Sequence, residues 1–407
     1  MTIPSSRRLL GVGVAAVVSL ALALAVAVEA GSSASRSPAG SRASVTPFRI
    51  ALLTELSGRF APTRKPFNDG LVTYFKTIGG KIAGHKFSLS VYDGQTDPTV
   101  GPGIARKAVS SKPNMLVIFL LSTSTAAAEP IFESADLPTM GPGIPDDWVN
   151  GPKVRSWAFG LGSALENAQA FDAALKYLFK GNVKGKRVAI TGDNSAFDTL
   201  ILNDLKALAP KSGWTVATEK FGDFTELSWA SQAADVASAK PDAIIDITIG
   251  APTILHAKAY GTAGIKVPIV SFVGLNVASD VKGIAMPNWY MVTAGRYGGY
   301  KSGSLIPKAA AKYGTSASSE GGLYASGWAT GAIVARALKL CGVGCSSSKL
   351  LSVLAKFRNY AVPGGALYGP VTFTKNDHSG VTAFGLVKYD PKTDGLADVT
   401  TLKLPQS

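Results

Sequence analysis

The 407-residue chain contains few residues of the kinds that hold metals or form cross-links. It has two cysteines, Cys341 and Cys345, and three histidines, at positions 85, 256 and 378. The histidines lie far apart in the sequence, and two cysteines alone supply fewer ligands than a structural zinc site requires. We therefore expect neither a metal site nor a cofactor.

Motifs of the common hydrolases and nucleotide-binding enzymes are also missing. The chain contains no G-x-S-x-G nucleophile motif and no phosphate-binding P-loop. The segments Gly101-Pro102-Gly103 and Gly141-Pro142-Gly143 lack the third glycine of a dinucleotide-binding fingerprint. We predict that the protein is not an enzyme, which leaves a secreted hydrolase as a disfavoured alternative.

Acidic residues are scarce relative to basic ones. The 27 acidic and 41 basic residues give a formal net charge of +14, which can attract anions, nucleic acids or acidic surfaces. The basic residues are scattered, however, and the densest cluster, at positions 180, 184, 186 and 187, has no interleaved aromatic motif of a nucleic-acid-binding module. We therefore predict no nucleic-acid binding.

Long apolar runs are absent except at the N-terminus. Arg7 and Arg8 precede an uncharged stretch over residues 9–28 that is mostly Ala, Val and Leu, and Ala30 ends a short cleavage motif. This pattern predicts a signal peptide over residues 1–30, of the general secretory or twin-arginine type, and an exported protein of the periplasm, cell envelope or exterior. An uncleaved anchor is the alternative, because the run could span a bilayer. Residues 31–46 are rich in Ser, Ala, Gly and Pro, which predicts a flexible linker.

The clearest pattern in the remaining chain is the stretch from Met115 to Pro130, MLVIFLLSTSTAAAEP. Its first seven residues are apolar without alternation, which predicts a strand buried on both faces of a parallel sheet. The hydroxyl residues 122–125 follow as a predicted loop, and three alanines then favour a helix. The free N–H groups at a helix start can bind a polar or anionic ligand group. The hydroxyl groups could instead only cap that helix.

Strand and helix patterns alternate along the rest of the chain. Predicted strands are 48–54, 86–92, 115–121, 137–140, 187–191, 214–220, 242–249, 267–272, 290–293, 371–374 and 383–389, and predicted helices are 67–78, 104–111, 164–179, 197–208, 227–239, 253–263 and 322–340. This order predicts an α/β protein with two doubly wound sheets. We expect residues 47–163 and 294–380 to form an N-terminal lobe, and residues 164–293 and 381–407 a C-terminal lobe, with a ligand cleft between them.

Several segments resemble the branched-chain amino acid binding proteins of ABC transporters, which are type I periplasmic binding proteins. The resemblance covers about residues 48–400 and rests on FRIALLTELSG, GGKIAGHKFSLSVYDGQTDP, LSTSTAAAEPIFE, AYGTAGIKVPIV and DHSGVTAFGLVKYD. It implies two lobes, joined by a hinge of three crossovers, that close on a small molecule and deliver it to a membrane permease. We expect a monomer. A ligand-sensing receptor ectodomain is the alternative, disfavoured because the sequence shows no fused signalling domain.

The resemblance also implies a set of ligand-binding positions. These are Ser57, Thr63, Ser122, Thr123, Ser124, Gly143, Phe197, Ile249 and Val273. Within this set, Ser122 matches the family's ligand-holding serine, Thr63 a first-loop position that faces the ligand, and Phe197 an aromatic residue of the second lobe.

Three positions depart from the amino acid site of that family. Pro145 stands where a threonine helps to hold the ligand carboxylate, and proline has neither an N–H group nor a hydroxyl. Ile249 replaces a tyrosine, and Val273 lies where an acidic residue pairs with the ligand ammonium. A buried ammonium without a counter-charge is unfavourable. We therefore predict a small carboxylic or aromatic ligand rather than a branched-chain amino acid. Arg59 and Arg64, in the predicted first loop, could favour an anion or lie in solvent.

We predict that Cys341 and Cys345 form an intrachain disulfide, because the chain is expected to be exported to an oxidising compartment and has no other cysteine. The bond would close a very short loop, so its entropic stabilisation should be small. Titration of denatured, unreduced protein with a thiol reagent should detect no free thiol, whereas reduced protein should react at both cysteines. Two reactive thiols in the unreduced protein would contradict the prediction.

Overall fold

The computed structural model describes residues 48–142, 144–150, 154–223, 225–272, 286, 288–298, 300, 304–319, 321–393 and 395–405. The predicted signal peptide and the whole predicted linker lie outside these ranges, as do the predicted ligand-binding residues Gly143 and Val273. Within the described residues, no helix is both long and apolar enough to cross a membrane.

The first sheet has six strands in the order β2-β3-β1-β4-β5-β6. The strands are β1 (Phe48–Thr54), β2 (Lys81–Ile82), β3 (His85–Asp93), β4 (Met115–Phe119), β5 (Thr139–Gly141) and β6 (Ala158–Gly160). All pairings are parallel except that of β2 with β3, at the edge of the sheet. Every residue of β4 is buried, as its unbroken apolar sequence predicts.

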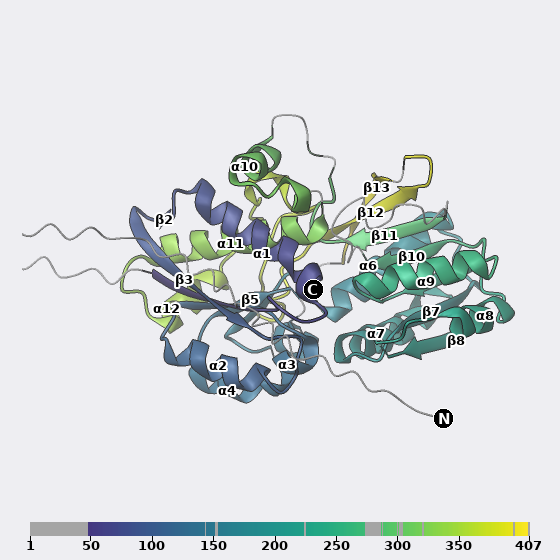
Figure 1. The fold of residues 1–407 in the computed structure, drawn as a ribbon, viewed down its shortest axis with the longest axis horizontal. Coiled ribbons are helices and arrows are strands. Elements are labelled where there is room, and N and C mark those ends of the chain that lie inside the picture. The colour runs from purple at the N-terminus through teal and green to yellow at the C-terminus, as the bar shows by residue number, and fades with distance from the viewer. Residues whose placement is uncertain are drawn as a thin grey trace, which may run out of the picture. The chain divides into compact units, whose positions relative to one another are not determined.

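The helices near this sheet include two long ones that pack against each other, α1 (Ala61–Thr77) and α11 (Gly322–Cys341). The others are α2 (Gly101–Ser110), α3 (Ser122–Ala127), α4 (Glu129–Ala135), α5 (Asp146–Val149), α10 (Leu305–Tyr313) and α12 (Ser347–Leu354). Figure 1 shows α1 and α11 on one side of the first sheet, and α2, α3 and α4 on the other. The parallel strands are thus covered on both faces, as parallel sheets require.

The second sheet has seven strands in the order β13-β12-β11-β10-β9-β7-β8. They are β7 (Arg187–Asp193), β8 (Thr215–Gly222), β9 (Ala243–Asp246), β10 (Ile269–Phe272), β11 (Trp289–Thr293), β12 (Ala383–Asp390) and β13 (Gly395–Lys403). The strands from β8 to β11 pair in parallel, and β12 pairs antiparallel with both β11 and β13. Its helices are α6 (Ala164–Leu178), α7 (Ala196–Ser212), α8 (Ala230–Ser238) and α9 (Ala251–Thr262).

The predicted α/β class with two doubly wound sheets is confirmed, but three local predictions are wrong. Residues 122–125 form the first turn of α3 rather than a loop before a helix. Helix α1 begins at Ala61, earlier than predicted, because Pro62 fits the first turn of a helix, where no N–H partner is needed. Residues 371–374 are not a strand, and Val371 makes only isolated bridges to Tyr360 and Val381.

Glu166 joins two of the segments that connect the sheets. Ser163 and Glu166 form a capping box at the start of α6, in which each side chain accepts a hydrogen bond from the other's backbone N–H. The Glu166 carboxylate also accepts hydrogen bonds from the Ser379 hydroxyl at 2.7 Å and the Val381 N–H at 3.1 Å. Burial raises the pKa of Glu166 to about 8, and these hydrogen bonds oppose the rise. The segment entering α6 and the segment entering β12 are therefore fastened together.

Cys341 and Cys345 lie beside each other at the C-terminal end of α11, with their Cα atoms 5.6 Å apart. This separation is within the range found for disulfides. The geometry is compatible with the predicted bond, which thiol titration would test.

The packing of α1 on α11 depends on two glycines. A Cβ atom at Gly70 would overlap the carbonyl oxygen of Tyr324, and a Cβ atom at Gly327 would overlap that of Phe67. Glycine weakens the interior of a helix, yet here it lets two backbones approach more closely than any other residue would allow. This close approach fixes the position of α1 relative to α11.

We predict that Gly327→Ala lowers the free energy of unfolding by about 1–3 kcal/mol, because the added methyl group overpacks the contact between α1 and α11. Gly103→Ala is a matched control, since Gly103 lies in α2 with open space around the position of its Cβ atom. That control should raise the free energy of unfolding by about 0.5–1 kcal/mol through helix propensity. Urea unfolding of the three proteins measures both changes, and equal effects of the two substitutions would refute the role of the helix contact.

Candidate ligand-binding site

A cavity of about 180 Å³ lies where the two sheets present the carboxyl ends of their strands. The first sheet contributes the segments that follow β1, β4 and β5 to the lining. The second sheet contributes the segments that follow β7, β9 and β11, and the end of β10. The first turns of α11, residues 161–162, Asn167 of α6 and Phe384 of β12 complete the lining. Ligands gather at this edge in open α/β sheets, because the loops and helix starts converge there.

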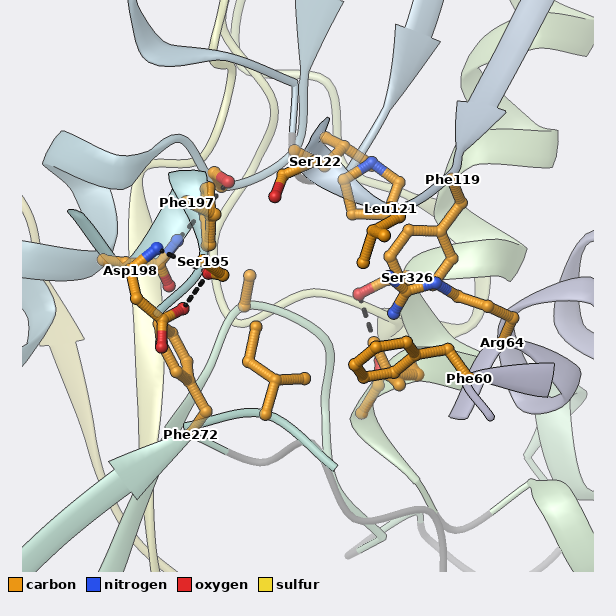
Figure 2. Close-up of a pocket in the computed structure, with 18 of the residues that line it drawn as sticks. Phe60, Arg64, Phe119, Leu121, Ser122, Ser195, Phe197, Asp198, Phe272 and Ser326 are labelled. Carbon is orange, nitrogen blue, oxygen red and sulfur yellow. Dashed lines mark hydrogen bonds between the residues drawn. The ribbon is translucent and has the colours of Figure 1, made fainter. Parts of the chain in front are cut away.

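The walls are predominantly apolar and contain several aromatic rings. Phe60 and Phe119 lie on one side of the cavity, and Phe197 and Phe272 lie on the other (Figure 2). Leu121 points into the space between them. Such a lining suits the hydrophobic body of a small organic compound, with a few polar groups left to orient it.

Arg64 is a buried cation in this wall. It lies in the first turns of α1, is 7% exposed, and points toward the cavity from the side of Phe60 and Phe119 (Figure 2). Its guanidinium carbon stacks 3.9 Å from the centre of the Phe119 ring and lies 5.5 Å from that of Phe60. Its Nε atom is buried and has no hydrogen-bond partner among the described residues.

Burial lowers the pKa of Arg64 to about 10, and the nearby Glu55 carboxylate opposes this change. Glu55 is itself occupied: it accepts hydrogen bonds from the Leu121 N–H at 2.8 Å and the Thr96 N–H at 2.6 Å. The first of these bonds holds the start of α3 against the end of β1. A buried guanidinium without a paired anion is unfavourable, so the site would gain from a bound carboxylate.

Two acidic residues lie in the lining contributed by the second sheet. Asp193 ends β7 and Asp198 lies in the first turn of α7, and both are at least 95% buried. Asp198 accepts hydrogen bonds from the Asp193 N–H at 2.8 Å and the Ser195 hydroxyl at 2.9 Å, as part of the cap of α7. Burial raises the pKa of both carboxyl groups, that of Asp193 to about 7.

A polar network lies under this wall, inside the second sheet. Asp246 at the end of β9 is 3.0 Å from the His256 Nδ1 atom, and it accepts a hydrogen bond from the Tyr260 hydroxyl at 3.2 Å. The Trp229 ring stacks on the His256 ring with centres 3.6 Å apart. These side chains are 0–1% exposed and do not line the cavity. The charges of Asp246 and His256 affect the pKa of Asp193, which does line it.

Four of the predicted ligand-binding residues line the cavity. Ser122 and Thr123 reach it from the start of α3, Phe197 from α7, and Ile249 from the segment after β9. The structure thus brings together positions that lie far apart in the sequence. Whether they contact a ligand stays a prediction.

Three other predicted positions lie outside this lining. Ser57 is exposed, and its hydroxyl donates a hydrogen bond to Asp93 at 2.6 Å. Thr63 is buried on α1, where its side chain lies against Gly250. Ser124 is fully buried one turn into α3, and its hydroxyl has no hydrogen-bond partner among the described residues. The change from loop to helix at Ser122 explains the last case, because Ser124 then faces the protein interior.

The sequence alone did not identify the acidic residues Asp193 and Asp198 as site residues, and it left two possible places for Arg64, at the cleft or in solvent. Asp193 ends an apolar strand of a predicted parallel sheet, and that position by itself could have marked it as a candidate. Arg64 was expected in a loop, whereas the earlier start of α1 turns it toward the cavity. Arg64 is buried because of the way α1 packs, and the local sequence pattern does not predict that packing.

The fold has counterparts among solved structures. An ABC-transporter solute-binding protein from Rhodopseudomonas palustris, solved in complex with benzoate, matches with a TM-score of 0.74 and 18% identity, over 88% of this chain and 97% of that one. A substrate-binding protein of an ABC transporter from Sphaerobacter thermophilus matches with a TM-score of 0.74 and 18% identity, over 88% and 98% of the two chains. A leucine-binding protein from Thermotoga maritima matches with a TM-score of 0.70 and 17% identity, over 88% and 99%.

A search of curated protein sequences found no significant match. The model of the family described as "Periplasmic binding protein" matches residues 47–395, which is most of the chain. The predicted type I periplasmic binding protein fold is therefore confirmed, and the prediction that the protein is not an enzyme agrees with a family of binding proteins. The chain belongs to the periplasmic binding protein family.

Proposed function

We propose that this chain is the exported solute-binding protein of an ABC transporter, and that it captures a small aromatic or aliphatic carboxylate. The observation that carries the proposal is Arg64, a 93% buried guanidinium at the cavity with its Nε atom unpartnered among the described residues. Guanidinium groups bind carboxylates through paired, charge-assisted hydrogen bonds. A carboxylate in this cavity would supply the missing anion.

The rest of the lining supports an apolar body for that acid. The aromatic rings of Phe60, Phe119, Phe197 and Phe272 surround the space in front of Arg64. Stacking of the guanidinium on Phe119 holds it in place before the ligand arrives, which lowers the entropic cost of binding. The benzoate complex of the R. palustris protein adds support, because benzoate combines a carboxylate with an apolar ring.

Export, delivery and the division into lobes belong to the same proposal. Residues 1–30 act as the signal peptide and 31–46 as a linker. The lobes comprise residues 47–163 with 294–380, and residues 164–293 with 381–407. The monomer closes on its ligand by a hinge motion and hands it to a membrane permease. The ABC-transporter descriptions of two matched structures support this role. A receptor ectodomain stays the alternative, since other matched structures are described as extracellular ligand-binding receptors.

We predict that Arg64→Met raises the free energy of unfolding of the ligand-free protein by about 1–4 kcal/mol, because an apolar side chain of similar length replaces a buried charge that forms no ion pair among the described residues. Arg106→Met is the matched control: Arg106 is exposed on α2, outside the cavity lining, so its replacement should change stability by less than about 0.5 kcal/mol. Urea unfolding of ligand-free protein measures both values. A less stable Arg64→Met protein would show that Arg64 stabilises the empty structure instead of awaiting an anion.

We predict that benzoate and small aliphatic acids bind more tightly than leucine, isoleucine or valine. Calorimetric titration of the purified protein with this panel measures the order of affinity. Arg64→Met should weaken binding of the acids by roughly 10- to 100-fold, the range for a lost hydrogen bond to a charged group. Arg64→Lys should retain part of the affinity, since lysine keeps the charge but loses the paired geometry.

The Arg106→Met protein is the control for this experiment as well, and its affinity for acids should match that of the unchanged protein. Tight binding of leucine with no binding of any acid would disprove the proposed ligand class. Equal affinity of the Arg64→Met and Arg106→Met proteins for benzoate would place the carboxylate elsewhere in the cavity.

A further inference from the structure

We propose that Asp193 selects ligands that carry a hydrogen-bond donor at the end remote from their carboxylate. The occupant of the cavity would then be a carboxylate with a hydroxyl or amino group at its far end. This inference rests on the proposed carboxylate specificity and adds a second recognition element to the same site.

The first observation is that Asp193 has unused acceptor capacity inside the cavity lining. The residue is 5% exposed and lines the cavity, and no described residue donates a hydrogen bond to its carboxylate. The neighbouring Asp198 differs, because the Asp193 N–H and the Ser195 hydroxyl already occupy its two carboxylate oxygens. Asp198 therefore belongs to the helix cap, whereas Asp193 is available to a ligand.

The second observation is the placement of the acidic and basic groups. Asp198 and Ser195 lie on one wall of the cavity, and Arg64 lies on the opposite wall, with open space between them (Figure 2). Asp193 adjoins Asp198 through the 2.8 Å hydrogen bond of its N–H group. A ligand bound to Arg64 through its carboxylate therefore directs its other end toward the acidic wall.

The surrounding charges favour a donor at this end of the ligand. Burial raises the pKa of Asp193, and Asp246 and Asp223 raise it further, while His256 and Arg59 lower it. A buried carboxylate that has lost its water needs donors in return. A hydroxyl or ammonium group supplies them, whereas a methyl group leaves the carboxylate unsatisfied and a second carboxylate adds repulsion.

The same placement separates this ligand class from the α-amino acids. The ammonium of leucine is one carbon atom away from its carboxylate, so the two groups cannot contact opposite walls at once. A ring or short chain between the two polar groups allows both contacts. Asp193 therefore does not take the role of the acidic residue that pairs with the ligand ammonium in the family's amino acid site. It would contact the opposite end of the ligand.

Matched ligands isolate the contribution of Asp193. Para-hydroxybenzoate and para-methylbenzoate have nearly the same shape, and only the first can donate a hydrogen bond to a carboxylate. We expect calorimetry on the full chain to give roughly tenfold tighter binding of the hydroxy acid, as for one hydrogen bond to a charged group. Terephthalate, which carries a second carboxylate in place of the hydroxyl, should bind more weakly than either.

Asp193→Asn is the decisive variant, because it keeps the shape of the side chain and removes its charge. In this variant the hydroxy acid should bind at most about threefold more tightly than the methyl acid, because the hydrogen bond to a charged group is lost. Asp235→Asn is the control: Asp235 lies on α8, is exposed, and pairs with Lys220 outside the cavity. That variant should keep the full preference.

The outcomes separate this inference from the proposed function. If both acids bind with equal affinity to the unchanged protein, or if Asp193→Asn keeps the preference, the role of Asp193 is refuted while the carboxylate specificity stands. Tighter binding of terephthalate would also refute it, because Asp193 would then have to be protonated and act as a donor. If none of the acids binds, the proposed function and this inference fall together.

Discussion

The parallel pairing of buried strands is the constraint on which the rest of the structure depends. Because β1, β3 and β4 run in the same direction, their carboxyl ends meet at one edge of the first sheet, and β7, β9 and β10 do the same in the second. Each strand must then continue through a loop or helix start at that edge. The cavity forms where these two sets of segments face each other. The topology of the sheets therefore determines which segments line the cavity, whatever side chains those segments carry.

The cavity contains two buried charged side chains, Arg64 and Asp193, that we expect not to stabilise the ligand-free protein. Arg64 is buried against Phe119 with its Nε atom unpartnered, and Asp193 is a buried carboxylate without a donor among the described residues. Both arrangements are unfavourable in an empty cavity. The helix contact at Gly70 and Gly327 belongs to the packing that holds α1 in place, and thus Arg64 near the cavity. Under the proposed function, stability lost at the site would become differential affinity for the ligand that completes it.

The sequence predicted the elements better than it predicted the directions of the side chains. The unbroken apolar run from Met115 to Leu121 predicted a buried central strand, and the structure forms that strand over Met115–Phe119. Ser122 and Phe197 were expected at the site and do line the cavity. Ser124, only two residues from Ser122, points into the interior, because the hydroxyl stretch is helical and successive side chains turn by 100°. Such errors arise from element boundaries, which depend on tertiary contacts more than on local preference.

By itself, the sequence determined the α/β class, the alternation of strands and helices, and the absence of recognisable catalytic motifs, because hydrophobic periodicity and motif spacing are local properties. The amino acid family resemblance came from segments along most of the chain, and the family match agrees with it. Only the tertiary structure decided that Arg64 is buried beside Phe119, that Asp193 shares its cavity, and that Ser57 and Thr63 lie outside the lining. These facts depend on which helix faces which wall, and that is fixed by packing between residues distant in sequence.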